Sequence, residues 1–478
     1  MAKLKVMEII GRRNEIQLLK NLKESKSSSF VAVYGRRRVG KTFLVRNVFS
    51  NQFNFSVTGM SKVSLAQQLS NFHLALQKYD PSAKEKEPAK DWITAFQQLS
   101  NLLEFGKSGK KLIFFDELPW FDTAQSGFIS ALEHFWNSWA SARTDIILIV
   151  CGSAAGWMIS RLINNKGGLH NRVTHRIRLD PFSLKECEEF LKKKKANFDR
   201  YQVIQLYMVM GGIPFYLEQI DIAQSAAQNI DKLCFGKEGI LRTEFDNLYA
   251  SLFDNAEKHV SIIEALSKKT KGLTRAELMK GAKLPSGGSV TRILNELEES
   301  GFIRKYVAYG KKERNSLYQL TDFYSLFYLK FIKKSSILDE NNWINSLDSP
   351  EQRAWSGYAF EQISLTHIKE IKQALGISGV QTNTSSWIST GRPGAQIDLI
   401  IDRRDHVINV CEMKFSLNSF TIDKKYAEEL RNKIGIFKDE SKTRKSVFLT
   451  MITTFGLNKN QYSMSLVQNE LTMDVLFE

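Results

Sequence analysis

The sequence predicts an α/β protein with a parallel sheet in its first part and a separate α/β domain at its C-terminal end. Two observations carry this prediction. Short apolar runs at residues 30–34, 53–57, 112–115 and 146–150 are typical of buried strands, and the stretches between them are long enough for crossover helices. Beyond Ser349, after a long helical region, a second α/β pattern begins, with apolar runs at residues 398–401 and 407–411.

Length and composition are those of a globular protein, but the charge is unusual. The 478 residues suffice for roughly three domains. The 67 lysines and arginines exceed the 51 acidic residues and give a formal charge of +16. Such an excess favours a polyanionic partner, because bound cations release counterions from nucleic acid. We therefore expect DNA as a partner; the alternative is that the charge serves only solubility.

The cysteines and the apolar segments indicate in which cellular compartment the protein is expected. Cys151, Cys187, Cys234 and Cys411 lie far apart and form no C-x-x-C pair, which argues against a zinc site or a disulfide framework. The N-terminus lacks the apolar core of a signal peptide, and no apolar run approaches the ~18–20 residues of a membrane span. We expect a soluble, cytoplasmic protein with no membrane association.

The segment after the first strand has the composition of a phosphate-binding loop. Such a loop needs glycines so that backbone N–H groups can curl around phosphates, a lysine for the β and γ phosphates, and a hydroxyl for Mg²⁺. A helix should follow directly and add its positive N-terminal dipole. The residues expected to bind ATP here are Gly35, Arg36, Arg37, Arg38, Val39, Gly40, Lys41, Thr42 and Phe43.

Two later strands end in residues that complete such a site. The run 112–115 is followed by Asp116, expected to hold Mg²⁺ together with Thr42, and by Glu117, expected to polarise the attacking water. The alternative is two solvated acids at a strand end, and the phosphate loop earlier in the chain argues against it. A further strand ends at Ser153, whose hydroxyl is expected to contact the γ-phosphate or the water.

Three motifs together resemble the AAA-related, STAND-like ATPases of archaea and bacteria over residues 8–335. They are Gly11-Arg12-Arg13-Asn14-Glu15, the arginine-rich loop at residues 35–42, and Gly211-Gly212-Ile213-Pro214. The resemblance implies that Pro214 packs near the adenine. It also implies a homo-oligomer in which an arginine acts on the neighbouring subunit. Arg172, which precedes Pro181-Phe182-Ser183, is the candidate, with Arg176 and Arg178 as rivals.

Residues 257–320 have the pattern of a winged helix-turn-helix. Thr274 and Glu277 form a capping box, Ser286-Gly287-Gly288 makes a turn, and Gly301 ends the third helix. Two short strands then flank a basic turn. The expected DNA contacts are Ser289, Thr291 and Arg292 on the third helix and Lys311, Lys312 and Arg314 in the wing. Glu296, Glu298 and Glu299 would repel phosphates, so an interdomain lid or partner surface is the alternative.

The C-terminal domain offers a second cluster of charged residues. Asp398 opens one strand, and a polar turn leads to a second strand that ends with Glu412 and Lys414 on one face. A hairpin that joins these strands would bring two carboxylates and an ammonium together. Such a cluster can hold Mg²⁺ and activate water for attack on a phosphodiester.

This spacing resembles the PD-(D/E)xK nuclease superfamily, although Ile397 stands where the motif has proline. The resemblance implies a restriction-endonuclease-like domain, with Glu361 as an additional metal ligand from an early helix and Lys414 as a catalytic residue. The alternative is that the fold persists as a scaffold without catalysis. The whole protein would then be a regulatory NTPase switch, or a DNA-remodelling ATPase of a mobile element or defence system.

The expected domain order follows from these segments. Residues 1–180 form the P-loop core, 181–254 a helical lid, 255–335 the winged helix-turn-helix and 349–478 the nuclease-like domain. A polar linker around Asp339, Glu340, Asn341 and Asn342 precedes the last domain.

Overall fold

The computed structural model describes residues 8–104, 109–165, 167–253, 255–285, 287–335, 342–391 and 394–478. Within it the chain divides into two compact units, each taken by itself below. One contains the chain up to Pro181 together with Asn295–Gly301, and the other contains Phe182–Leu294 and Phe302–Glu478. Ser286 of the predicted turn and residues 339–341 of the predicted linker lie outside the described residues.

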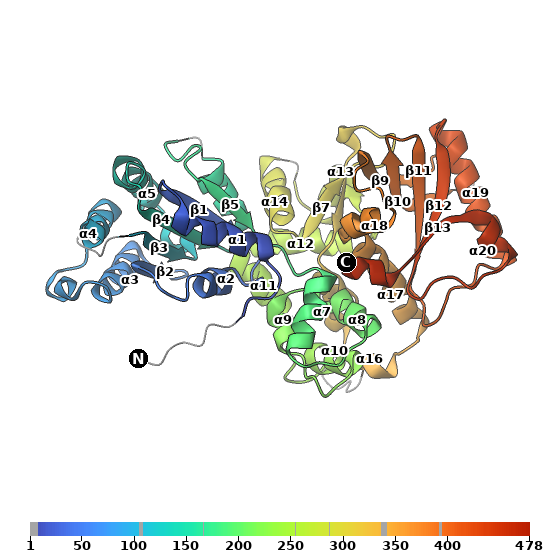
Figure 1. Ribbon diagram of the computed structural model, residues 1–478, viewed down its shortest axis with the longest axis horizontal. Coiled ribbons are helices and arrows are strands. Elements are labelled where there is room, and N and C mark those ends of the chain that lie inside the picture. The colour runs from blue at the N-terminus through green and yellow to red at the C-terminus, as the bar shows by residue number, and fades with distance from the viewer. Residues whose placement is uncertain are drawn as a thin grey trace. The chain divides into compact units, whose positions relative to one another are not determined.

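The first unit contains the predicted parallel sheet (Figure 1). Its strands lie in the order β2-β3-β4-β1-β5, and each neighbouring pair is parallel. The central strands are buried along nearly their whole length, as strands covered on both faces must be. The bounds are β1 (Ser29–Tyr34), β2 (Phe55–Thr58), β3 (Lys111–Asp116), β4 (Ile146–Gly152) and β5 (His175–Arg178).

Crossover helices connect these strands, and an aromatic core forms on one side of the sheet. The Phe115 ring of β3 packs against those of Phe55, Phe72 and Phe96, and the Phe72 and Trp92 rings meet edge to face at 5.7 Å. The helices are α1 (Arg13–Asn21), α2 (Lys41–Val48), α3 (Leu65–Gln77), α4 (Trp92–Glu104), α5 (Phe128–Phe135) and α6 (Ala155–Trp157).

The second unit begins with helices, as predicted for residues 181–254. They are α7 (Leu184–Lys193), α8 (Arg200–Met210), α9 (Pro214–Glu218), α10 (Ala226–Cys234) and α11 (Glu244–Leu252). The Gly211-Gly212 pair turns the chain between α8 and α9. Gly212 has φ +70°, and a Cβ there would lie 2.2 Å from the Phe182 carbonyl oxygen. The Phe182 N–H also donates to the Gly212 carbonyl at 2.8 Å, so this turn requires glycine.

Next come three helices and a small sheet, all in the second unit except Asn295–Gly301 at the end of the third helix, which belong to the first. The elements are α12 (Ala256–Ser267), β6 (Leu273–Thr274), α13 (Arg275–Gly281), α14 (Gly288–Glu299), β7 (Ile303–Tyr306) and β8 (Leu317–Leu320), and the sheet order is β6-β8-β7. The predicted capping box forms at the start of α13, because the Thr274 N–H donates to the Glu277 carboxylate at 2.8 Å. Gly301 after α14 has φ +74°, the left-handed conformation predicted for it.

Further helices lead into a mixed sheet at the C-terminal end. The elements are α15 (Phe323–Lys330), α16 (Asn342–Asn345), α17 (Pro350–Thr366), α18 (Ile368–Ala374), β9 (Thr382–Ile388), β10 (Gln396–Arg403), β11 (Val407–Lys414), α19 (Lys424–Ser441), β12 (Ser446–Thr453), α20 (Gln461–Leu466) and β13 (Val467–Thr472). Strands β9, β10 and β11 form an antiparallel meander, and β12 and β13 continue the sheet in parallel.

Helix α19 covers one face of this second sheet (Figure 1). Its residues Leu430 and Phe437 are buried against Ile400, Val410 and Leu449 of three neighbouring strands. The segment after β7 is docked onto the same domain. The Tyr309 N–H donates to the Ser386 carbonyl at 2.7 Å, and the Tyr309 ring lies 5.5 Å from that of Phe437. The small sheet and the C-terminal sheet are therefore joined within the second unit.

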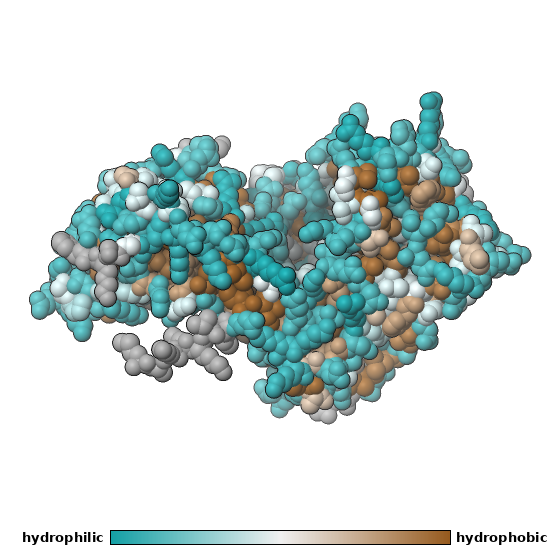
Figure 2. Space-filling view, viewed as in Figure 1, coloured by the Kyte–Doolittle hydropathy of each residue, from teal (hydrophilic) through white to brown (hydrophobic). Residues whose placement is uncertain are grey.

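The surface is mainly hydrophilic on the face shown in Figure 2, where hydrophobic residues appear as separate patches. Among the residues that the structure describes, no helix is both long enough and apolar enough to cross a membrane. The four cysteines are buried and carry free thiols.

Candidate functional site

The predicted phosphate loop joins the carboxyl end of β1 to the start of α2. Gly35 has φ +139°, and a Cβ there would lie 2.3 Å from the Leu179 carbonyl oxygen, so no larger residue fits. Gly40 has φ +91° and is the N-cap residue of α2. The loop thus curls where backbone N–H groups and the helix dipole both face an incoming phosphate.

The Lys41 side chain is folded into this loop. It is 5% exposed, and its ammonium donates to the carbonyls of Gly35 at 3.0 Å and Arg36 at 2.8 Å. Burial lowers the pKa of Lys41, because desolvation disfavours the ammonium. The buried cation has carbonyl partners, and binding of an anionic phosphate would compensate its charge.

The predicted magnesium ligands meet directly. The Thr42 hydroxyl donates to the Asp116 carboxylate at 3.0 Å, across from α2 to the end of β3. Burial raises the pKa of Asp116. A hydroxyl and a carboxylate are oxygen donors of the kind that Mg²⁺ takes in phosphate sites, and so these residues fit the ion.

Glu117 follows Asp116 in a left-handed conformation, with φ +50°. Its carboxylate accepts hydrogen bonds from the Ser153 hydroxyl at 2.8 Å and from the Ser153 N–H at 3.2 Å. Ser153 therefore orients Glu117. The predicted contact of Ser153 with the γ-phosphate or the water stays a prediction.

The other residues predicted for this site lie in different places. Arg12 donates to the carbonyl of Asp180, which ties the start of α1 to the end of β5. Arg172 is exposed, and so is Arg176; Arg178 pairs with Asp180 at 2.9 Å. Pro214 opens α9 in the second unit, and its predicted contact with adenine remains a prediction.

A second constellation lies in the C-terminal sheet, where the predicted hairpin is present. Leu399 pairs with Cys411 across the β10–β11 ladder, and Asp398 and Glu412 are the next residues on their strands. On the other side of β10, the register with β9 shifts between Ile397 and Ile400, which indicates a β-bulge around Asp398. Bulges redirect side chains next to functional sites. Gln396 donates a hydrogen bond to the Asp398 carboxylate.

Glu412 is buried and held by three partners. Its carboxylate lies 3.2 Å from the Lys414 ammonium and 2.6 Å from that of Lys433, and it accepts a hydrogen bond from the Tyr426 hydroxyl at 2.9 Å. Burial opposes the charged form, but Lys433 and Lys414 outweigh it and lower the pKa of Glu412. The carboxylate is thus charged, and two ammonium groups and a hydroxyl surround it.

Glu361 on α17 lies close enough to the other acids to respond to them. Burial, then the charges of Asp398 and Glu412, raise the pKa of Glu361 to about 8. Burial and Glu412 also raise the pKa of Asp398. In the described part of the chain, however, no three His, Cys, Asp or Glu side chains are placed to hold a metal ion together. The predicted ligands Glu361, Asp398 and Glu412 are near enough to influence one another, but their carboxylates are not arranged to hold one metal ion together.

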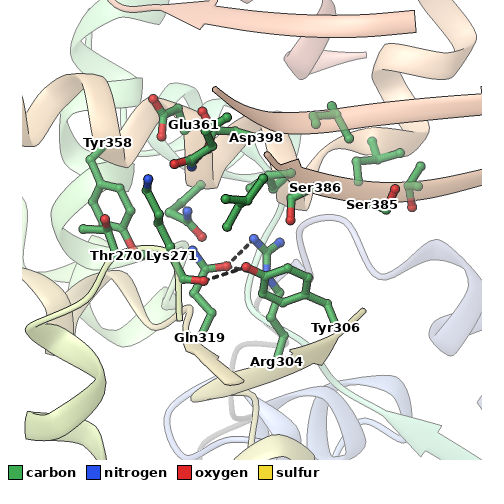
Figure 3. Close-up of a pocket in the computed structure, with 17 residues that line it drawn as sticks. Thr270, Lys271, Arg304, Tyr306, Gln319, Tyr358, Glu361, Ser385, Ser386 and Asp398 are labelled. Atoms are coloured by element: carbon green, nitrogen blue, oxygen red, sulfur yellow. Dashed lines mark hydrogen bonds between the residues drawn. The ribbon is translucent and has the colours of Figure 1, made fainter. Parts of the chain in front are cut away.

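A pocket of about 230 Å³ opens beside Glu361 and Asp398 (Figure 3). The small sheet supplies Arg304, Tyr306 and Gln319 to its lining, and the loop before β6 supplies Lys271. The C-terminal domain supplies Tyr358, Glu361, Asp398 and the polar residues Thr384, Ser385 and Ser386 of β9. Glu412 and Lys414 are not among its lining residues.

The predicted DNA contacts are exposed. Arg292 lies on the surface of α14, as do Ser289 and Thr291. Lys311, Lys312 and Arg314 lie in the exposed connection between β7 and β8. Their exposure is compatible with phosphate contacts.

Sequence reasoning missed several residues of the C-terminal constellation. Lys433 and Tyr426 both reach Glu412 from α19, and their spacing of seven residues puts them on one face of that helix. That spacing was the available signal. Lys271 and Arg304 gave none, because they join the pocket only through the packing of the small sheet on the C-terminal domain.

The comparisons with known proteins agree with the first site. Residues 9–220 match the protein family described as an ATPase domain predominantly from Archaea. An uncharacterized protein of Methanocaldococcus jannaschii is 23% identical over 394 residues, which cover 82% of this chain and 83% of that protein.

Solved structures that resemble the chain are distant. The match to a Walker-type ATPase of Pyrococcus abyssi covers 68% of this chain and 96% of that protein, with 16% identity and a TM-score of 0.49. The ORC2 protein of Aeropyrum pernix covers 68% and 93%, with 15% identity and a TM-score of 0.39. A STAND protein of Pyrococcus horikoshii covers 79% and 53%, with 16% identity and a TM-score of 0.32.

The family match and the loop geometry together define the class of the protein. Residues 9–220 contain a P-loop ATPase domain, and its loop brings Lys41 to the Gly35 and Arg36 carbonyls and Thr42 to Asp116.

Proposed function

We propose that the protein is a DNA-directed ATPase whose C-terminal domain is a metal-dependent nuclease under the control of ATP. The observation that carries the proposal is the hairpin that places Asp398 beside Glu412, with Glu361 near enough to respond to both, on a chain that also contains the Thr42–Asp116 site. We assign the domains as predicted: a P-loop core at 1–180, a helical lid at 181–254, a winged helix-turn-helix at 255–335 and a nuclease-like domain at 349–478.

In the ATPase site each residue has one task. Bound Mg²⁺ would neutralise charge on the phosphates, with Thr42 and Asp116 as its protein ligands. Lys41 contacts the β and γ phosphates, and Glu117 accepts a proton from the attacking water. Arg172 acts on the nucleotide of a neighbouring subunit in a homo-oligomer; its exposure supports that role.

In the C-terminal site Asp398 and Glu361 would hold the metal, with Glu412, which is paired with Lys414 and Lys433, as the further carboxylate. A divalent cation there would supply an activated water and shield the phosphodiester. Lys414 lies beside Glu412 and stabilises negative charge on the phosphate. The raised pKa values of Glu361 and Asp398 support this assignment, since a bound cation would offset the repulsion between the acids.

Purified protein incubated with supercoiled plasmid, ATP and Mg²⁺ or Mn²⁺ tests the nuclease. We expect nicking by the wild type, a loss of at least about 100-fold in Glu412→Ala, and normal nicking in Glu428→Ala, an exposed glutamate of α19. No nicking by the wild type, or equal nicking by Glu412→Ala, contradicts the nuclease assignment.

The DNA contacts are tested by their salt dependence. Replacing Lys311, Lys312 and Arg314 with glutamine should weaken duplex binding at every sequence and reduce the log–log salt slope by up to about 0.9 for each phosphate that the wing no longer neutralises. The matched control replaces Lys84, Lys86 and Lys90, which are exposed in the first unit, and removes the same charge. Equal effects of the two triple variants would rule out a specific wing contact.

One observation favours a second candidate function. The Glu412 carboxylate is already satisfied by Lys414, Lys433 and Tyr426, as in a structural network. The alternative is therefore a regulatory NTPase switch whose C-terminal domain binds nucleic acid without cutting it. Tight binding by a wild type that never nicks, in either metal, would favour this function.

A further inference from the structure

The pocket beside Glu361 and Asp398 is lined by cations that the ATPase and nuclease assignments do not use. Arg304 on β7 donates from Nε to the Gln319 side-chain oxygen at 2.9 Å, and its guanidinium lies 5.4 Å from the centre of the Tyr306 ring. Among the described residues no ion pair links Arg304 to a carboxylate, whereas the charge of Lys271 acts on Asp398 and opposes the rise in the pKa of that carboxyl. Burial lowers the pKa of Arg304, and only tyrosines contribute the opposing charge effect.

A guanidinium that is withdrawn from water without a carboxylate is costly to keep. The burial of the Arg304 guanidinium is explained if an anion occupies the site for part of the time. Figure 3 shows the Lys271 side chain directed toward the side of the pocket where Glu361 and Asp398 lie. The position of this loop is fixed, because the Tyr306 hydroxyl donates to the Lys271 carbonyl at 2.6 Å. The cations and the acids therefore face one space from two domains.

The rest of the lining suits a nucleotide. The Tyr306 and Tyr358 rings border the space and offer faces on which a base can stack. Thr270, Thr384 and Ser385 add hydroxyls of the kind that contact phosphate and sugar. The volume of about 230 Å³ is below that of pockets for drug-sized ligands, so the pocket takes at most one nucleotide of a strand and excludes a duplex.

We propose that this pocket receives one unpaired nucleotide of a DNA strand, with Lys271 and Arg304 on its phosphate and the Glu361–Asp398 pair beside it. The inference rests on the proposed nuclease function, because it names the substrate of that site, but it makes a claim about DNA binding alone. It makes the C-terminal site a composite one, completed by the small sheet, and it assigns unpaired DNA rather than intact duplex as the substrate class.

Binding is measured by fluorescence anisotropy of a labelled thymidine oligonucleotide, single-stranded or paired with its complement, on the full chain in Ca²⁺ without ATP. We expect the wild type to prefer the single strand. Lys271→Gln and Arg304→Gln should each weaken single-strand binding about tenfold or more, as loss of a charged hydrogen bond does. Lys268→Gln, an exposed lysine three residues from Lys271 and outside the pocket, should bind like the wild type.

A second measurement on the wild type covers the case in which Arg304→Gln fails to fold. Photocrosslinking with an oligonucleotide that contains 5-iododeoxyuridine should join DNA to peptides that contain Tyr306 or Tyr358. Crosslinks confined to other peptides, or binding unchanged in both pocket variants, would overturn the inference. A wild type that binds the single strand through Arg304 but cuts no DNA would instead remove the nuclease function and leave the pocket assignment standing.

Discussion

Two hydrogen bonds from Ser153 hold the carboxylate that is expected to activate water. Glu117 accepts from both the hydroxyl and the N–H of Ser153, and only the first of these bonds depends on the side chain. The residue at the end of β4 therefore positions the residue at the end of β3. General-base catalysis contributes about 10²–10⁴-fold, whereas loss of a positioning bond costs less.

We accordingly predict that Glu117→Gln lowers the ATP turnover number by at least about 100-fold. Ser153→Ala should lower it only about three- to tenfold, because the Ser153 N–H remains to orient Glu117. Steady-state phosphate release at saturating ATP measures both values. A Ser153→Ala effect as large as that of Glu117→Gln would mean that Ser153 itself contacts the phosphate or the water.

The acid pair in the C-terminal site makes stability depend on pH. The pKa of Glu361 is raised from 4.5 to about 8 by burial and by Asp398 and Glu412. The folded state therefore retains this proton between those values while the unfolded chain has lost it. Stability from this residue is fully present below about pH 4.5 and falls as the pH rises toward 8.

We predict that Glu361→Gln, measured in EDTA, stabilises the protein at pH 9 by at least about 1 kcal/mol, because it removes a buried charge. That corresponds to about 1–2 °C in the melting temperature of a unit of this size. The difference should shrink near pH 5, where the wild-type carboxyl is protonated. If Glu361→Gln and the wild type melt at the same temperature at pH 9 as well as at pH 5, Glu361 is not close to the other acids.

Among the elements, the turn between α8 and α9 is tightly constrained by its backbone geometry. Gly212 has a positive φ, and an added Cβ would lie 2.2 Å from the Phe182 carbonyl oxygen. By contrast, Gly435 lies within the long helix α19, where an added Cβ would meet nothing within 4 Å.

We predict that Gly212→Ala destabilises the protein by about 1–3 kcal/mol, because the strained φ and the clash act together. Gly435→Ala should stabilise it by up to about 1 kcal/mol, since alanine is the better helix former. Urea unfolding of both variants measures the two changes. A neutral Gly212→Ala would imply that the Gly-Gly-Ile-Pro segment moves freely away from Phe182.

Elements that depend on local sequence could be predicted, and through-space arrangements could not. Strand β1, the loop from Gly35 and the capping box at Thr274 follow from neighbouring residues alone, and all three are present. The hairpin that brings Asp398 to Glu412 followed from two strands and a polar turn. The bulge at Asp398 depends on the register between two strands, which no short segment encodes. The approach of Lys433 to Glu412 depends on a partner 21 residues away in the chain.

At the scale of the whole chain, the two sites belong to different compact units. The loop at Gly35 lies in the first unit and the acids at Glu361 and Asp398 in the second. The small sheet between residues 273 and 320 contributes to the lining of the pocket of the second site. The proposed control of the C-terminal domain by ATP would link the two sites.

ATP hydrolysis is the central claim on which the control depends, and the Lys41 ammonium is its most specific requirement. The most direct test is phosphate release from Mg²⁺-ATP by the wild type, Lys41→Ala and Lys20→Ala, the last an exposed lysine of α1 in the same unit. We predict turnover by the wild type and by Lys20→Ala, and a loss of at least about 100-fold in Lys41→Ala. Hydrolysis by Lys41→Ala at the wild-type rate would contradict the assignment of the loop as the ATPase site.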